Sequence, residues 1–144
     1  MKLGAASDHA GFELKEELKA YLESEGHAVE DFGCYESTSC DYPDYARKLC
    51  EAMLSGVCER GILVCGTGLG MSYAANRHRG IRAALCMNAE MARLSRSHND
   101  ANVLVLGARL IDPSVARDTL RAWMDTPFEG GRHLRRIQKI DAYQ

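Results

Sequence analysis

The feature that most constrains the fold is the stretch GILVCGTGLGMS, residues 61–72. Its first five residues are apolar and predict a buried parallel strand that ends at Cys65. Three glycines stand among the next five residues, and a helix is expected from Met71. Such a strand, loop and helix unit points backbone N–H groups at whatever lies above the strand, and the helix N-terminus adds positive potential. The stretch therefore predicts an anion site with Cys65, a possible thiolate base or nucleophile, at its edge.

Apolar strands and amphipathic helices alternate along the whole chain, which indicates a parallel sheet with helices on both faces. We expect one domain over residues 1–144 with an α/β fold: a three-layer, Rossmann-like, doubly wound sheet of five parallel strands, followed by a C-terminal helix. The strands are expected at 2–6, 28–32, 61–65, 81–86 and 102–106, and the helices at 11–25, 43–55, 71 onward, 88–96, 113–125 and 132–142. In such sheets the ligand lies beyond the carboxyl ends of the strands.

Composition excludes several classes of function. The net charge of −2 gives no basic face for nucleic acid, so no nucleic-acid partner is expected. No apolar run approaches the roughly 18 residues of a membrane span, and the N-terminus lacks a signal-peptide pattern. The six cysteines show no C-x-x-C spacing, so they are interpreted as mostly buried thiols of a cytoplasmic protein without a metal.

Two groups are expected to meet beyond the strand ends. Asp8 and His9 follow the first strand and can hydrogen-bond a polyol or a phosphate. The alternative is that Asp8 caps the helix that follows. The glycine loop that follows the strand 61–65 is expected to face Asp8 and His9 and to bind an anion. Its sequence matches neither a Walker loop nor a dinucleotide-binding fingerprint, and the alternative interpretation is a tight turn without a binding role. Its residues are Gly66, Thr67, Gly68, Leu69 and Gly70.

A second polar group falls at the other end of the expected sheet. His98 and Asn99 precede the last strand, so they should lie away from Cys65 of the same chain. If His98 acts with Cys65, a second chain must supply it. Arg132 and Arg136 share one face of the last helix at a spacing of four residues, which suits a phosphate dianion.

Five motifs in order make the chain resemble the type-B ribose-5-phosphate isomerases, members of the RpiB/LacA/LacB sugar-phosphate isomerase family. The motifs are SDHAG at 7–11, DYP at 41–43, CGTGLG at 65–70, SRSHNDAN at 95–102 and EGGRH at 129–133. The resemblance covers essentially the whole chain. The resemblance implies a cofactor-free aldose–ketose isomerase of the pentose phosphate pathway, which interconverts ribose 5-phosphate and ribulose 5-phosphate through a cis-enediolate.

The resemblance also implies roles for individual residues. Cys65 would be the base, and His98 and Thr67 would assist ring opening. Substrate contacts would come from Asp8, His9, the loop Gly66 to Gly70, and Asn99, with a phosphate site formed by Arg109, Arg132 and Arg136. The family forms homodimers or tetramers whose active sites are shared between chains. Some members carry a glutamate base on the next helix instead, where this chain has Ser72 and Tyr73.

Alternatives remain at this point. One alternative substrate is a six-carbon sugar phosphate, allose 6-phosphate or galactose 6-phosphate. Pocket size would select it, through the residues after Asp41 and around Met71 and Tyr73. A non-catalytic phosphosugar-binding module is a second hypothesis. A redox switch at Cys65 is a third. A flavin carrier is disfavoured because no aromatic pair is evident beside the glycine loop to sandwich the ring.

Overall fold

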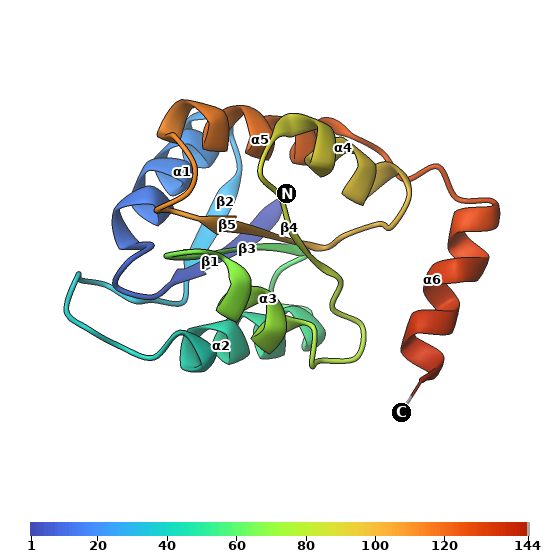
Figure 1. Cartoon of the computed structure of the whole chain (residues 1–144), viewed down its shortest axis with the longest axis horizontal. Coiled ribbons are helices and arrows are strands. Elements are labelled where there is room, and N and C mark those ends of the chain that lie inside the picture. Colours follow the sequence, from blue (N-terminus) through green and yellow to red (C-terminus); the bar gives the residue numbers. More distant parts are fainter. Residues whose placement is uncertain (144) are drawn as a thin grey trace.

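The computed structural model describes residues 1–143, which form one parallel sheet flanked by helices (Figure 1). The strands run in the order β2-β1-β3-β5-β4, and all neighbouring pairs are parallel. Their bounds are β1 Lys2–Ser7, β2 Ala28–Asp31, β3 Arg60–Cys65, β4 Ala83–Leu85 and β5 Val103–Gly107. The helices are α1 Phe12–Ser24, α2 Tyr42–Leu54, α3 Leu69–Ala75, α4 Ala89–Ser97, α5 Pro113–Asp125 and α6 Arg132–Ala142. The expected fold class is confirmed.

Local signals explain most element ends. Pro113 opens α5 and Pro43 lies in the first turn of α2, where the missing N–H of proline costs no helical hydrogen bond. Asn88 caps α4, since its side chain accepts a hydrogen bond from the Met91 amide at 2.9 Å. Most other bounds agree with the expectation to within one residue, and two elements differ by more. Helix α3 already begins at Leu69, and β4 covers only Ala83–Leu85 of the expected strand 81–86.

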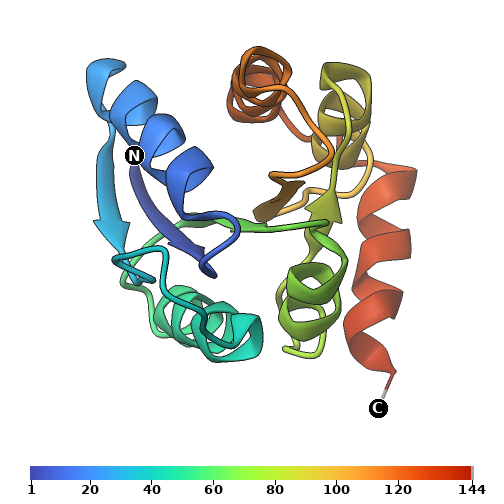
Figure 2. The ribbon, with the colours of Figure 1, turned by 60° about the vertical axis from the view of Figure 1, so that its left-hand side comes forward.

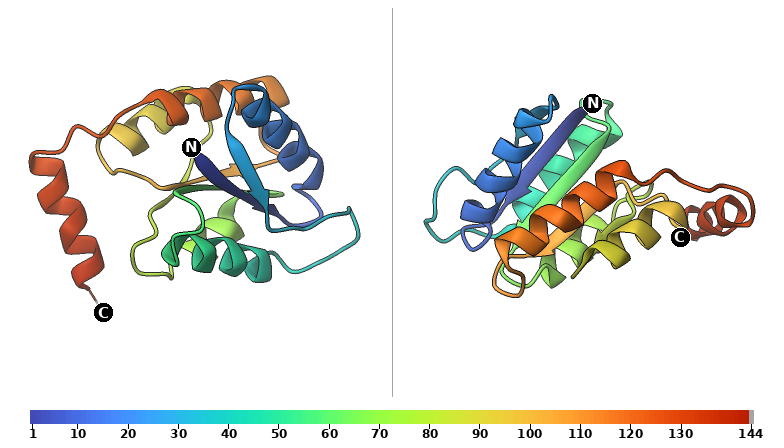
Figure 3. Two further views of the ribbon diagram at one scale, coloured as in Figure 1. Left: turned by 180° about the vertical axis from the view of Figure 1, so that it is seen from behind. Right: turned by 90° about the horizontal axis from the view of Figure 1, so that it is seen from above.

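Each central strand sends alternate side chains to two separate cores. Ile62 and Val64 of β3 pack with the apolar sides of α1, α4 and α5. Leu63 and Cys65 pack with α2 and α3. The two helix layers lie above and below the sheet in Figure 1 and appear from behind and from above in Figure 3. This alternation fixes Cys65 on the α2–α3 side of the sheet, at the carboxyl end of its strand.

Helix α6 stands beside the three-layer body rather than in either layer (Figures 1 and 2). Asp141 fastens its far end, because one carboxylate oxygen accepts from the Gly80 amide at 3.0 Å and the other lies 3.8 Å from Arg82. Leu134 and Ile140 remain about half exposed on it. The helix therefore offers apolar side chains that the rest of this chain does not cover.

Across residues 1–143, no helix combines the length and apolar character needed to cross a membrane.

Candidate active site

Close backbone packing builds the glycine loop after β3. Cys65 pairs with Gly107 at the end of β5, and the Thr67 backbone occupies the place where a Gly107 side chain would stand. Gly68 precedes α3 with a φ of 80°, a left-handed conformation that glycine adopts without steric cost. The Gly68 amide donates a hydrogen bond to the Cys65 Sγ at 3.2 Å. The fold thus holds the thiol against a backbone N–H group.

Cys65 and Thr67 differ in their exposure to solvent. Cys65 is only 4% exposed, so its thiol is nearly enclosed by the loop and the α2–α3 core. Thr67 is exposed, and its Oγ1 accepts from the Leu69 amide at 3.2 Å. The hydrogen bond from the Gly68 amide fixes the position of the Cys65 sulfur at the edge of the loop. This arrangement suits proton abstraction by Cys65.

Asp8 and His9 lie at the same edge of the sheet. The Asp8 amide bonds to the Val64 carbonyl at 3.2 Å, which places the pair beside the end of β3. The Asp8 carboxylate accepts from the Gly11 amide at 3.0 Å, but Gly11 itself is the N-cap of α1, and no side chain of residues 1–143 caps that helix. His9 Nδ1 accepts from the Cys40 amide at 3.2 Å. With Nδ1 held as an acceptor, neutral His9 carries its proton on Nε2 and can donate it to an oxygen.

Arg109 completes this edge. Its amide donates to the Gly66 carbonyl at 2.9 Å, and its guanidinium lies over Gly66, where a Cβ would meet Nη1 at 3.0 Å. The guanidinium is therefore close to the loop within one chain. Cys65, the glycine loop, Asp8, His9 and Arg109 form a single polar edge, called the thiol edge below.

His98 and Asn99 lie at the opposite end of the sheet, as the sequence predicts. Gly61, at the start of β3, bonds through its amide to Asn102, and His98 ends helix α4 just before that segment. The four steps from Gly61 to Cys65 span about 13 Å. His98 stacks on His133 with ring centroids 4.3 Å apart and planes 11° apart. Exposed Arg132 and Arg136 flank His133, and these residues form the histidine edge.

Comparisons with known proteins identify relatives that match this chain over almost its whole length. A family model described as Ribose/Galactose Isomerase matches residues 3–140. The chain belongs to this family. It is 43% identical over 143 residues to ribose-5-phosphate isomerase B of Escherichia coli, covering 99% of this chain and 96% of the relative. It is 40% identical over 146 residues to D-erythrulose-4-phosphate isomerase of Pectobacterium atrosepticum, covering 100% and 95%. A crystal structure of ribose 5-phosphate isomerase RpiB from Thermotoga maritima is 58% identical, with a TM-score of 0.97 over 99% of this chain and 98% of that one.

The structure places three further residues beside the candidate site residues. The Tyr42 ring packs on Gly70, so that a side chain there would collide with it. Cys40 fixes His9 through its amide, as described above. His133 stacks on His98. Tyr42 and His133 both lie inside motifs of the resemblance, and Tyr42 also directly follows Asp41, where the sequence places candidate determinants of the sugar.

Burial and neighbouring charges shift the pKa values of several titratable groups. Burial lowers the pKa of His133, and the nearby positive charges of His98 and Arg132 lower it further. Burial raises the pKa of Cys50 to about 12 and that of Cys86 to about 11. Those two thiols remain protonated and inert, as expected for core cysteines. All six cysteines are free.

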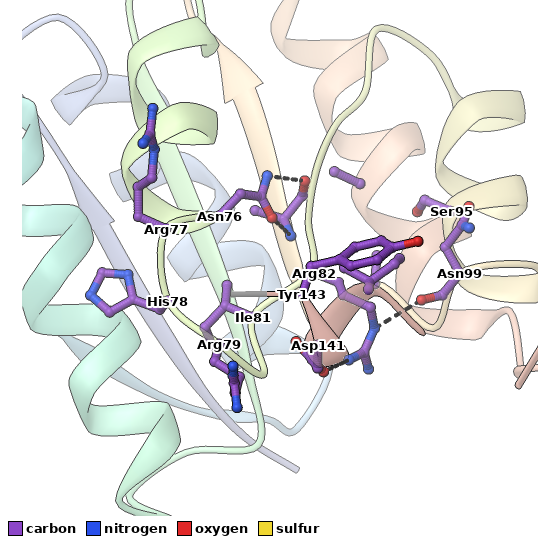
Figure 4. A pocket seen from close by; sticks show the side chains of 14 residues that line it. Asn76, Arg77, His78, Arg79, Ile81, Arg82, Ser95, Asn99, Asp141 and Tyr143 are labelled. Carbon is purple, nitrogen blue, oxygen red and sulfur yellow. Dashed lines mark hydrogen bonds and ion pairs between the residues drawn. The ribbon is translucent and has the colours of Figure 1, made fainter. Parts of the chain in front are cut away.

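A cavity of about 590 Å³ lies between α6 and the body and is not lined by Cys65. Figure 4 shows its wall, where Arg82 reaches both Asp141 on α6 and the Asn99 carbonyl. The Arg82 Nε lies 3.0 Å from that carbonyl oxygen. The cavity therefore opens next to the histidine edge rather than the thiol edge.

Proposed function

We propose that this chain interconverts ribose 5-phosphate and ribulose 5-phosphate, without a metal or cofactor, in the pentose phosphate pathway. The observation that carries the proposal is the thiol edge, where a nearly enclosed Cys65 thiol meets a backbone N–H donor beside Asp8, His9 and Arg109. The whole-length similarity to ribose-5-phosphate isomerases of E. coli and T. maritima supports it.

The chemistry follows from these positions. The C2 proton of an open-chain aldose is weakly acidic because the adjacent carbonyl accepts the charge, so its removal needs a tuned base. The Cys65 thiolate takes that proton to give a cis-enediolate, and it returns the proton to C1 while the C2 hydroxyl proton moves to O1. N–H groups of the glycine loop stabilise the enediolate oxygen, and one such donor is worth roughly 3–4 kcal/mol in a hydrolase.

We further propose that each site is shared between two chains of a homodimer or tetramer. The residues that the resemblance assigns to ring opening and to the rest of the phosphate site lie on the histidine edge, about one strand length from the thiol edge. They are His98, Asn99, Arg132 and Arg136. The uncovered apolar side chains of α6 and the cavity beside it offer a place for a second copy of this chain. In the shared site, His98 and Thr67 would open the sugar ring, and Arg109, Arg132 and Arg136 would bind the phosphate.

The deciding experiment is proton NMR of ribose 5-phosphate in D₂O with chelator-treated protein. Wild type should convert it to ribulose 5-phosphate with exchange of the transferred hydrogen. Cys65→Ala should lose activity by several orders of magnitude, because no other thiol lies on the loop. Cys86→Ala is the matched control and should stay active, since that thiol is buried in the opposite core. Full activity of Cys65→Ala would contradict the proposal.

The main alternative keeps the chemistry and changes the sugar. Its support is the 40% identity to an enzyme named for a four-carbon sugar phosphate, together with the family description, which includes galactose. Comparing kcat/KM for ribose 5-phosphate, allose 6-phosphate, galactose 6-phosphate and erythrulose 4-phosphate decides between them. A clear preference for another sugar would reassign the substrate, and binding without turnover would favour a non-catalytic module.

We also propose a cytoplasmic location. The six free cysteines support it, because thiols stay reduced in that compartment.

A further inference from the structure

Three potential metal ligands converge on the histidine edge. The donor atoms of His98, Glu129 and His133 all lie within 4.8 Å of one another. His98 closes α4, Glu129 lies in the loop before α6, and His133 is the second residue of α6. The loop is fastened to α4 because the Glu129 amide donates to the Ser97 carbonyl at 3.0 Å. The ligands are thus held together by backbone contacts as well as by their own side chains.

The donor set selects the class of ion. Two imidazoles and one carboxylate are the ligands of many zinc sites that keep a fourth position open. Magnesium and calcium prefer oxygen donors, so they fit this set poorly. We propose that His98, Glu129 and His133 bind Zn²⁺ as an inhibitory ion.

Small side-chain movements are enough to form the site. Glu129 Oε2 already lies 3.8 Å from His133 Nε2. The two imidazole rings are nearly parallel, so one must turn before both nitrogens reach a single ion at about 2.0–2.1 Å. His98 is the ring that turns, because His133 is more deeply buried. The exposed Glu129 side chain moves freely toward the ion.

Neighbouring charges decide how tightly the ion is held. Arg132 and Arg136 act on His133 from the same helix, and their positive charge opposes a divalent cation. Only the carboxylate of Glu129 offsets them within the cluster. We therefore expect the zinc ion to bind reversibly rather than to be a permanent part of the protein. Its effect on catalysis rests on the proposed function, in which His98 opens the sugar ring: a lone pair given to zinc is not available for proton transfer.

Binding is tested first, without any activity measurement. Chelator-treated wild type and Glu129→Gln are titrated with Zn²⁺ by calorimetry and with Co²⁺ by visible absorption. We expect one site per chain in wild type. Even outer-shell groups contribute about 10–100-fold to metal affinity, so loss of this ligand should weaken binding by at least about 10-fold. His133→Gln should weaken it similarly.

Inhibition is tested next. Glu129→Gln should turn over ribose 5-phosphate as wild type does, but need at least about 10-fold more Zn²⁺ for the same inhibition. Equal zinc affinity in wild type and Glu129→Gln would overturn the proposal, as would no binding in wild type. A thiolate-to-cobalt band that disappears in Cys65→Ser would also overturn it, because the metal would then sit on Cys65. If zinc binds as expected but the protein does not isomerise sugar phosphates, the proposed function fails and the metal site stands.

Discussion

At the scale of single residues, burial separates the cysteines by chemistry. Cys65 meets a backbone N–H donor at the edge of the sheet, whereas Cys50 is enclosed between α2 and the sheet and touches no such donor in the described hydrogen bonds. Desolvation penalises the thiolate, which is why the pKa of Cys50 rises to about 12. The same residue type thus serves as a candidate base in one place and as a small apolar side chain in the other.

This difference predicts a pH effect on stability. The folded pKa of Cys50 lies above the ordinary thiol value of 9.0, so the unfolded chain loses its proton first as pH rises. The contribution of Cys50 is therefore complete below about pH 9 and is lost as pH rises toward about 12. Cys50→Ala should be less stable than wild type near neutrality because of the cavity it leaves. The difference in the free energy of unfolding between wild type and Cys50→Ala should be smaller at about pH 10.5 than near neutrality, as measured by urea unfolding.

A stability difference between wild type and Cys50→Ala that stays constant with pH would contradict this account. Peptide mapping after iodoacetamide treatment of native protein gives an independent check, in which Cys50 and Cys86 should remain unlabelled.

At the scale of elements, one buried lysine joins three segments. Lys15 on α1 has a fully buried side chain, and its Nζ lies 2.7 Å and 2.9 Å from the two carboxylate oxygens of Asp31 at the end of β2. It also donates to the Cys34 carbonyl in the following loop. That loop leads to Cys40, whose amide donates a hydrogen bond to His9. The Lys15–Asp31 ion pair therefore helps to hold the loop that positions His9 at the thiol edge.

Removing Lys15 should be costly. Lys15→Met leaves the Asp31 carboxylate nearly buried, with Lys19 at 3.6 Å as its one remaining cationic partner within residues 1–143. We expect a loss of about 3 kcal/mol in the free energy of unfolding, because breaking a buried pair strands one charge. Lys15→Met with Asp31→Asn should recover part of that loss in urea unfolding, since no charge is then stranded. Equal stability of the single and double variants would exclude a stranded charge as the cause.

At the scale of the whole molecule, the two edges define complementary halves of the proposed active site. Mixing inactive variants tests this directly. Cys65→Ala lacks the base and His98→Asn lacks the ring-opening group, so each should be nearly inactive alone. Random pairing of the two variants gives half of the dimers one chain of each kind. In each such dimer, one of the two sites combines an intact Cys65 with an intact His98 from the other chain. Mixing after mild unfolding and refolding should therefore restore about a quarter of wild-type activity.

No recovery from mixtures that size and mass analysis show to contain both variants would place both residues in one chain's site. A double variant carrying both substitutions is the control and should gain nothing from mixing with itself.

Local patterns in the sequence were enough for most of the architecture. Helix α5 runs over Pro113–Asp125 and α6 ends at Ala142, as periodicity and proline placement predict. The family is confirmed by the matches over the whole chain. The start of α3 was missed by two residues, because Leu69 and Gly70 look like loop until the packing of Gly68 beneath Leu85 closes the turn. The roles of the individual site residues stay predictions until the variants are measured.

The sequence by itself determined the alternation of strands and helices, the glycine loop after Cys65 and the placement of His98 at the other end of the sheet. These depend on side-chain periodicity and on strand direction, which are local properties of the chain. Only the tertiary structure decided that His133 stacks on His98, that Glu129 joins them, that Tyr42 covers Gly70 and that α6 stands apart from both helix layers. Most of these contacts join residues far apart in the chain. They depend on how the layers pack, which no local pattern specifies.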